Sequence, residues 1–235
     1  MISVVVEEKK YTDKIIISNK SDINHLKNVF RLKVGDKIRV VDGKFEYISC
    51  ICKIENDFIE VDVLEKNEDS FSLEIDIDAA ISLIKNDKMD ICIQKLAEIG
   101  IKNFIPISTK RCVVKLDKKK ERWDKIVNET MKQCRGVNPM KITDVISLDK
   151  INFSEYSHIV VPYECADNFT LKNLIKEIKD VKKILYIIGP EGGFETDEVE
   201  FLKTKGAFIV TLGKRILRAE TAAIVTGGVL VNEFQ

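Results

Sequence analysis

The feature that most constrains the fold is a change of pattern at about residue 70. Beyond it, short apolar runs typical of buried strands alternate with segments of helical periodicity to the end of the chain. Such alternation is the pattern of a parallel sheet with helices on both faces, so we expect an α/β domain over residues 71–235. The expected strands are 78–83, 104–107, 158–162, 184–188 and 208–212, and the expected helices are 88–99, 118–134, 170–179, 196–203 and 219–232.

The first 70 residues have a different character, with short β-rich runs separated by glycine-containing turn signals. This pattern predicts a small barrel or curled sheet as a separate domain of residues 1–70. One helix is expected over residues 22–30, where Asp22 is a candidate N-cap. The acid-rich segment 65–70 is the candidate linker. The expected strands are 2–6, 15–18, 37–41, 45–54 and 58–64.

The composition excludes a chain that is disordered as a whole, because 45% of the 235 residues are hydrophobic. The 38 Lys and Arg balance 38 Asp and Glu, so net charge provides no general attraction to nucleic acid or membranes. No apolar stretch is long enough to span a bilayer. Six scattered cysteines without a Cys-x-x-Cys pair indicate a reduced protein. We therefore expect a cytoplasmic protein with no membrane segment and no metal.

Positive charge is concentrated in the middle of the chain. Residues 102–135 contain 11 basic and 4 acidic residues. This pattern is typical of a surface that contacts RNA phosphates, and also of a solvated loop and helix face. Trp123, the only tryptophan, is interpreted as a packed helix residue rather than a platform for base stacking. The candidates for phosphate contacts are Arg31, Lys110, Arg111, Arg122 and Arg135.

Two glycine-bearing strand ends in the last third are the most informative motifs. The first glycine loop, residues 189–193, reads Gly-Pro-Glu-Gly-Gly after a buried-type strand, and Thr196 beyond it is a candidate cap of the next helix. The second glycine loop, residues 212–218, follows the last strand and begins Leu-Gly-Lys-Arg. Crevices at the carboxyl ends of parallel strands are the usual ligand sites of α/β folds. The alternative is that these glycines only turn the chain.

Neither loop has the spacing of a phosphate-binding motif. The Walker pattern and the Rossmann glycine pattern are both absent, and Glu191 inside the first loop would repel a polyphosphate. A neutral or cationic ligand fits better. An adenosine ligand with an amino-acid tail and a positive sulfonium, such as S-adenosylmethionine, meets this requirement.

The two loops together resemble the paired signature of the RsmE family. Its members are SPOUT-class methyltransferases that methylate N3 of a uridine in 16S ribosomal RNA. The matching segments read GPEGG at 189–193 and LGKRILRAETA at 212–222, and QKLAEIG at 94–100 is similar to a helix of the family. The resemblance covers nearly the whole chain. One departure is Ser3, because family members commonly have an arginine in this region.

The resemblance implies a PUA-like barrel over residues 1–70 that helps to bind RNA. It also implies a SPOUT methyltransferase domain over residues 71–235 with a deep trefoil knot, and a homodimer. The implied cofactor is S-adenosylmethionine, and the implied partner is 16S rRNA in the assembled small ribosomal subunit. The implied cofactor contacts are Gly189, Glu191, Gly192, Gly193, Leu212, Gly213, Ile216 and Leu217.

Methylation of N3 requires removal of a proton from the uracil nitrogen and stabilisation of the resulting negative charge. We expect Arg218 to stabilise this charge and Glu220 or Glu191 to accept the proton, because all three lie in or beside the glycine loops. The alternative is that Glu220 caps the last helix and pairs with Arg218. Two other functions stay open: a SPOUT methyltransferase that acts on another RNA, and a non-catalytic RNA-binding factor for ribosome assembly.

Overall fold

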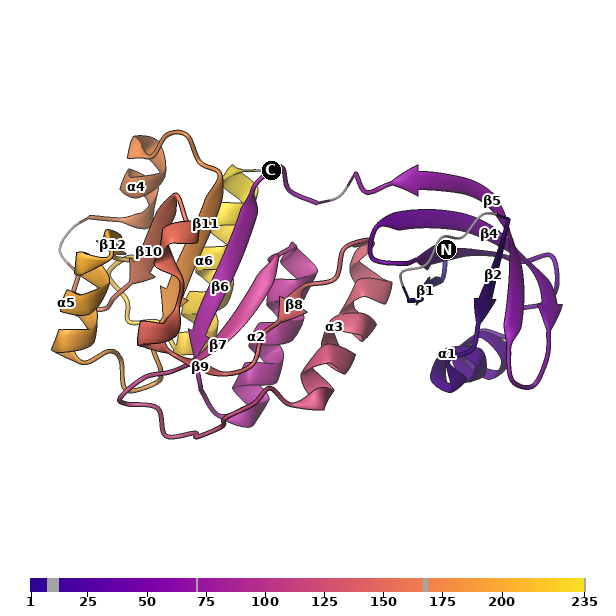
Figure 1. The fold of residues 1–235 in the computed structure, drawn as a ribbon, viewed down its shortest axis with the longest axis horizontal. Helices are drawn as coiled ribbons and strands as arrows, with labels where there is room; N and C mark the ends of the chain where they lie inside the picture. Colours follow the sequence, from indigo (N-terminus) through magenta and orange to yellow (C-terminus); the bar gives the residue numbers. More distant parts are fainter. Residues whose placement is uncertain (8–12, 71, 167–168, 235) are drawn as a thin grey trace. The chain divides into compact units, whose positions relative to one another are not determined.

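The computed structural model describes residues 1–7, 13–70, 72–166 and 169–234 (Figure 1). The chain divides into two compact units. The first comprises Met1–Ser72 with Met131–Pro139, and the second comprises Leu73–Thr130 with Met140–Gln235. A single boundary at residue 70 therefore does not describe the division, because residues 131–139 group with the first unit.

The first unit is one five-stranded sheet. Its strands are β1 (Ser3–Val5), β2 (Lys14–Ile17), β3 (Lys37–Val41), β4 (Phe45–Ile54) and β5 (Ile59–Glu68). Their order in the sheet is β1-β3-β4-β5-β2. Alternating side chains of these strands form the core, in which Ile38, Val40 and Tyr47 are fully buried. The predicted β-rich unit is confirmed, and register shifts between β4 and β5 curl the sheet.

The segment predicted as a linker is mostly strand. Strand β5 continues to Glu68, where it pairs with Phe45 at the start of β4. The interpretation of residues 65–70 as a linker was therefore wrong. A long partner strand supplies hydrogen bonds to the β5 backbone whatever the polarity of its exposed side chains, and low hydrophobicity does not reveal this.

The predicted helix of this unit has an unexpected cap and an irregular end. Helix α1 (Lys20–Asn24) continues into the π-helical turn η1 (His25–Val29). Asn19 caps α1, because it has an extended backbone and its side chain accepts hydrogen bonds from the first turn. Asp22 was the wrong choice of cap. Its buried carboxylate instead accepts a hydrogen bond of 2.6 Å from the Lys132 ammonium.

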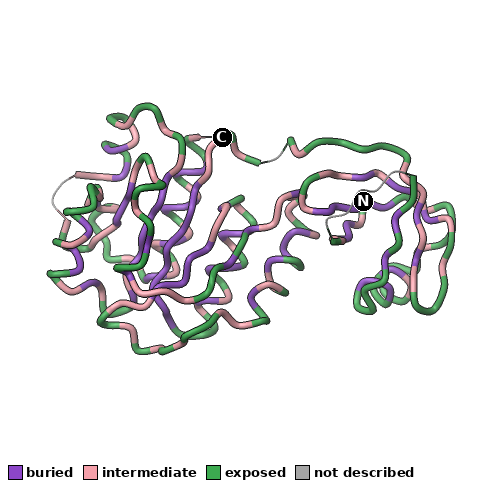
Figure 2. The backbone as a smooth tube through the Cα atoms, viewed as in Figure 1, coloured by how far each residue is buried: buried purple, intermediate pink, exposed green. Residues whose placement is uncertain are grey.

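The second unit is built on a parallel sheet, as predicted. Its strands are β6 (Asp76–Ser82), β7 (Asn103–Ser108), β8 (Lys141–Ile142), β9 (Ile146–Ser147), β10 (His158–Pro162), β11 (Lys183–Ile188) and β12 (Ala207–Val210). The order is β12-β10-β11-β6-β7-β8, with β9 also paired to β7, and every pairing is parallel. Figure 2 shows β6 and β11, in the middle of the sheet, as largely buried. The two-residue strands β8 and β9 were not predicted.

Helices cover both faces of this sheet. They are α2 (Asn86–Ile99), α3 (Glu121–Cys134, of which residues 121–130 belong to this unit), α4 (Leu171–Glu177), α5 (Thr196–Thr204) and α6 (Ala219–Glu233). Two short 3₁₀ turns, η2 (Leu148–Lys150) and η3 (Phe153–Glu155), precede β10. Helices α2 and α6 pack together, and α6 also contacts β6 and β11. Within the described ranges, no helix has the length and apolar character needed to cross a bilayer.

Helix α5 begins one residue beyond an acidic cap. Its N-cap is Glu195, whose backbone is extended with φ −71° and ψ 153°, so Thr196 is the first helical residue and not the predicted cap. The Glu195 N–H donates to the Glu198 carboxylate at 2.9 Å. Glu198 is the third residue of the helix, and its carboxylate thus satisfies the backbone N–H of the cap residue and stabilises the first turn.

Tyr186 on β11 allows a test of hydrogen bonding in this core. Its side chain is fully buried, burial raises its pKa well above the usual value, and its hydroxyl has no partner among the described residues. Tyr186→Phe is therefore expected to leave the free energy of unfolding unchanged or raise it by up to about 1 kcal/mol. Urea unfolding followed by the fluorescence of Trp123, the only tryptophan, measures this.

The matched control is Tyr156→Phe. The Tyr156 hydroxyl donates to Asp78 Oδ2 at 2.9 Å, so its removal leaves a buried carboxylate oxygen with one donor fewer. A loss of about 1–2 kcal/mol is expected there. Equal losses in the two variants would contradict the assignment of an unpartnered hydroxyl to Tyr186.

Candidate active site

A cavity of about 550 Å³ lies at the carboxyl ends of β10 and β11. Pro162 and Ile188, the last residues of these strands, line it, and so does the first turn of α6 through Ala219 and Ala222. Its volume is within the range of pockets that hold small molecules. Both glycine loops contribute to its wall. The lining includes seven residues that the family resemblance implies as cofactor contacts: Gly189, Glu191, Gly193, Leu212, Gly213, Ile216 and Leu217.

The backbone of the first glycine loop turns sharply where it meets the cavity. Gly193 has φ +71°, and a Cβ atom placed on it would lie 2.5 Å from Glu164 Oε1. The positive φ requires glycine, since an L-residue is strained there, and an added methyl group would also displace the Glu164 carboxylate, the end of an exposed side chain. Gly192 does not belong to the cavity lining. Its backbone instead lies against Arg111, whose Cβ would be 3.3 Å from a Cβ on Gly192.

Lys88 joins two of the predicted catalytic acids. The Lys88 ammonium lies 3.6 Å from Glu191 Oε1 and 3.9 Å from Glu220 Oε1, and its side chain lines the cavity. The Lys85 backbone N–H also donates to Glu191 Oε1, at 3.3 Å. Within the described part of the chain, Glu220 Oε2 is buried without a hydrogen-bond partner. The cation beside Glu220 is thus Lys88, and no ion pair joins Glu220 to Arg218 there.

Arg218 is positioned to meet a ligand. It is the N-cap residue of α6, it is exposed, and it lines the cavity. Its guanidinium makes no hydrogen bond or ion pair with any residue that the structure describes. Lys214 and Arg215 of the same loop are also exposed and also line the cavity. Three cations therefore border the cavity on the side of the second glycine loop.

Sequence analysis missed polar residues of the cavity wall that lie outside the two last strand ends. Among them are Lys88 in the first turn of α2 and the pair Tyr163 and Glu164, which directly follows β10. Burial raises the pKa of Tyr163, so it stays a neutral phenol at physiological pH. The signal that would have found them is their position just after predicted strands, at the edge of the sheet where the glycine loops also lie.

The predicted phosphate contacts are divided between the two units. Arg31 and Arg135 belong to the first unit, are exposed, and have left-handed backbones with φ 54° and φ 60°. In the second unit, Arg122 pairs with Asp90 at 2.5 Å. The remaining two, Lys110 and Arg111, are bonded to carboxylates at the start of α5. Their contact with RNA stays a prediction. By contrast, Trp123 is confirmed as a packed residue, because only 1% of it is exposed.

Comparison with known proteins identifies both units. Residues 72–231 match the family model described as RNA methyltransferase domain, and residues 17–64 match that of the RNA methyltransferase PUA domain. The ribosomal RNA small subunit methyltransferase E of Bacillus subtilis (strain 168) is 32% identical over 86% of this chain and 84% of its own length. The chain belongs to the ribosomal RNA small subunit methyltransferase E family. The resemblance seen in the glycine loops is confirmed.

Other members of the ribosomal RNA small subunit methyltransferase E family match over both units. Ribosomal RNA small subunit methyltransferase E 2 of Borreliella burgdorferi is 32% identical over 95% of this chain and 94% of that protein. The crystal structure of the family member from Neisseria gonorrhoeae, bound to S-adenosyl methionine, has a TM-score of 0.86 at 25% identity. That match covers 99% of this chain and 97% of the other.

Proposed function

We propose that this chain transfers the methyl group of S-adenosylmethionine to N3 of a uridine in 16S ribosomal RNA, with the assembled small subunit as substrate. The observation that carries the proposal is the cavity, because both glycine loops line it and Arg218, which is not bonded to any described residue, borders it. The family relationship supports the reaction class, and the relative from Neisseria gonorrhoeae holds S-adenosyl methionine.

The cavity fits this cofactor in size and charge. Its volume suits a nucleoside with an amino-acid tail. The carboxylates of Glu164 and Glu191 offer favourable contacts to a cationic ligand. When bound, S-adenosylmethionine supplies a methyl group on positive sulfur, which N3 attacks while the carbon–sulfur bond breaks and its electron pair stays on sulfur. The residues that would hold it are those of the implied contacts that line the cavity, namely Gly189, Glu191, Gly193, Leu212, Gly213, Ile216 and Leu217, whereas Gly192 lies against Arg111 outside the lining.

The charged residues beside the cavity supply the rest of the chemistry. Arg218 donates hydrogen bonds to the uracil carbonyl oxygens and stabilises the negative charge that develops as N3 loses its proton. Glu220 or Glu191 accepts that proton. Lys88 lies between the two carboxylates and orients them. Positioning and charge stabilisation therefore account for the rate, as this reaction requires.

RNA binding is assigned to basic residues of both units. In the first unit Arg31 and Arg135 are exposed, and in the second Lys110 and Arg122 contribute, whereas the predicted contact Arg111 is bonded to Glu195 and to the Gly192 carbonyl. Each phosphate contact releases counterions, so RNA affinity should fall steeply as salt rises. An affinity that does not change with salt contradicts this assignment.

We further infer that the second unit is threaded as a deep trefoil knot and that the protein is a cytoplasmic homodimer. The ribosomal substrate supports the location. Val225 and Val229, one turn apart on α6, are each 40% exposed and offer an apolar face to a second copy. Sedimentation equilibrium tests the homodimer, and a measured mass equal to that of a single chain would contradict it.

The decisive experiment is transfer of labelled methyl from S-adenosylmethionine to small ribosomal subunits that lack the modification, followed by digestion to nucleosides. Labelled 3-methyluridine is the expected product. Another labelled nucleoside, or labelling of a different RNA only, would contradict the substrate but keep the methyltransferase. Failure of the protein to bind S-adenosylmethionine would instead favour a non-catalytic assembly factor.

Gly193→Ala tests the glycine loop directly. Alanine is strained at φ +71°, and its methyl group would displace the Glu164 carboxylate, which also lines the cavity, so the change alters the cavity wall itself. We expect the Kd for S-adenosylmethionine to rise at least tenfold, roughly the effect of losing one well-placed contact. Isothermal titration calorimetry measures the change.

The matched control is Gly206→Ala. Gly206 has φ +79°, a Cβ on it would meet no atom of the described residues within 4 Å, and it lies between α5 and β12, outside the cavity lining. The two variants therefore carry the same backbone strain, worth about 1 kcal/mol of stability. Only Gly193→Ala should weaken cofactor binding, and an equal effect of both would contradict the role of the loop.

A further inference from the structure

Arg111 donates hydrogen bonds to the first glycine loop and to Glu195, two residues beyond it. Its Nε and Nη2 donate to the two oxygens of the Glu195 carboxylate at 2.8 and 3.0 Å. Its Nη1 donates to the Gly192 carbonyl at 2.8 Å. The guanidinium thus forms a bidentate pair with one acid and fixes a main-chain oxygen of the loop at the same time.

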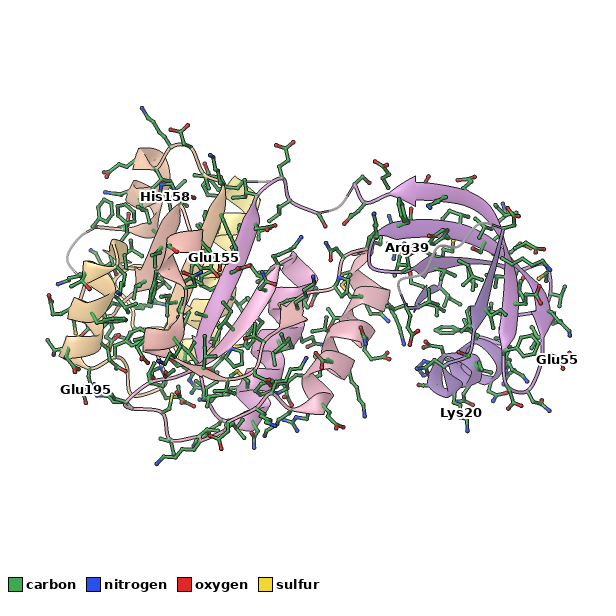
Figure 3. The ribbon with its side chains drawn as sticks, viewed as in Figure 1. Lys20, Arg39, Glu55, Glu155, His158 and Glu195 are labelled. Carbon is green, nitrogen blue, oxygen red and sulfur yellow. The ribbon has the colours of Figure 1, made fainter. Side chains whose placement is uncertain are left out.

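Lys110, the residue before Arg111, is also bonded to the first turn of α5. The Lys110 backbone N–H donates to Glu198 Oε1 at 2.9 Å, and the Lys110 ammonium pairs with Asp197. Glu198 is buried, with 7% exposed, and its other oxygen accepts from the Glu195 N–H. We name Lys110, Arg111, Glu195 and Glu198 the latch. Figure 3 labels Glu195 at the start of α5.

The latch and the cavity wall involve neighbouring residues of one short segment. Gly192 is against Arg111 and outside the cavity lining, whereas Gly193, the next residue, lines the cavity with φ +71°. Consecutive glycines have more conformational freedom than other residues, so a Gly-Gly segment does not hold a single conformation by itself. Ordering it on ligand binding costs free energy unless other contacts have ordered it beforehand.

We propose that Arg111 is a positioning residue that orders the first glycine loop for the cofactor. This inference rests on the proposed function, since it takes S-adenosylmethionine as the ligand of the cavity. The side chain acts through the Gly192 carbonyl and Glu195 and does not touch the cofactor. Only arginine suits the position, because a lysine ammonium cannot bond two carboxylate oxygens and a carbonyl in this planar arrangement.

The test uses the full chain and S-adenosylmethionine as the probe. Arg111→Gln is expected to raise the Kd for S-adenosylmethionine roughly tenfold, and Arg111→Lys should recover only part of the loss. Amide hydrogen exchange of residues 189–195 in the unliganded protein should become faster in Arg111→Gln. Lys125→Gln is the control, because Lys125 is an exposed basic residue of segment 102–135, which also contains Arg111, and does not belong to the latch. Its Kd should match the wild type.

A double-mutant cycle with Glu195→Gln identifies the route of the effect. If Arg111 acts through Glu195, Arg111→Gln with Glu195→Gln should weaken cofactor binding little more than either change alone. Losses that multiply would overturn the proposal. So would an Arg111→Gln protein that binds the cofactor like the wild type and loses only RNA affinity, because Arg111 is then a phosphate contact.

The outcomes also separate this inference from the proposed function. If the wild type fails to bind S-adenosylmethionine, the proposed function and the latch proposal fall together. If the wild type and Lys125→Gln bind it and Arg111→Gln binds it equally well, only the latch proposal falls. Melting curves of the variants check folding, and the conservative Arg111→Lys keeps the comparison valid if Arg111→Gln is unstable.

Discussion

Replacing Arg218 by alanine is expected to lower kcat for methyl transfer roughly 100-fold or more, the usual cost of removing a donor to a developing anion. The guanidinium borders the cavity and is not bonded to any described residue, so its hydrogen bonds remain for the substrate. The Kd for S-adenosylmethionine should change by less than about twofold, because the charge that Arg218 stabilises forms only during reaction. Single-turnover kinetics with saturating RNA and cofactor measure the rate.

Arg215→Ala is the control for the loss of charge alone. Arg215 lies in the same glycine loop, is equally exposed, and also lines the cavity. If the two variants lose the same rate, general positive potential and not the position of Arg218 is responsible. A rate within twofold of the wild type in Arg218→Ala, at unchanged cofactor affinity, would show that the catalytic assignment is wrong.

Asp78→Ala is expected to lower the free energy of unfolding by about 3 kcal/mol, because it leaves two part-buried donors and a nearby ammonium without their shared acceptor. Asp78 of β6 is 1% exposed. Its carboxylate accepts from Asn103 Nδ2 at 2.7 Å and from the Tyr156 hydroxyl at 2.9 Å, and the Lys183 ammonium lies 3.4 Å away. Burial and then the Asp78 charge raise the pKa of Tyr156, so the phenol remains a donor at neutral pH.

Urea unfolding followed by Trp123 fluorescence measures this loss within the α/β unit. Asp117→Ala removes an exposed carboxylate of the same unit and should change stability by less than about 0.5 kcal/mol. Asp78→Asn keeps the shape and one acceptor, so its loss should be intermediate. A loss below about 1 kcal/mol in Asp78→Ala would mean that the network contributes little.

Much of the fold could be predicted because the spacing of hydrophobic residues in most segments fits either a helix or a strand, and not both. Strands β3, β4 and β10 have the predicted bounds, and α2 and α6 begin or end at predicted residues. The errors share a cause. Strand β5 runs past its apolar part because β4 provides partners, and Asn19 rather than Asp22 caps α1 because the helix begins three residues earlier than predicted. Pairing and turn geometry depend on neighbours that a local pattern does not contain.

The candidate site, like the fold, could be predicted only in part. The family, the reaction class and the glycine loops could be recognised from residues 189–193 and 212–222, because their order and spacing are specific. Lys88 and Glu164 could not, since each is an ordinary charged residue until the fold brings it to the cavity.

The sequence by itself therefore determined the β-rich pattern of the first 70 residues, the parallel sheet and the two loops that line the cavity. Only the tertiary structure decided which charged side chains pair with each other. Arg111 belongs to a basic segment that predicts RNA contact, yet its guanidinium is bonded to Glu195 and Gly192, 84 and 81 residues away along the chain. The physical reason is that periodicity and glycine strain are local properties of the chain. Charge pairing instead depends on distances that exist only after strands such as β7 and β11 take their places in one sheet.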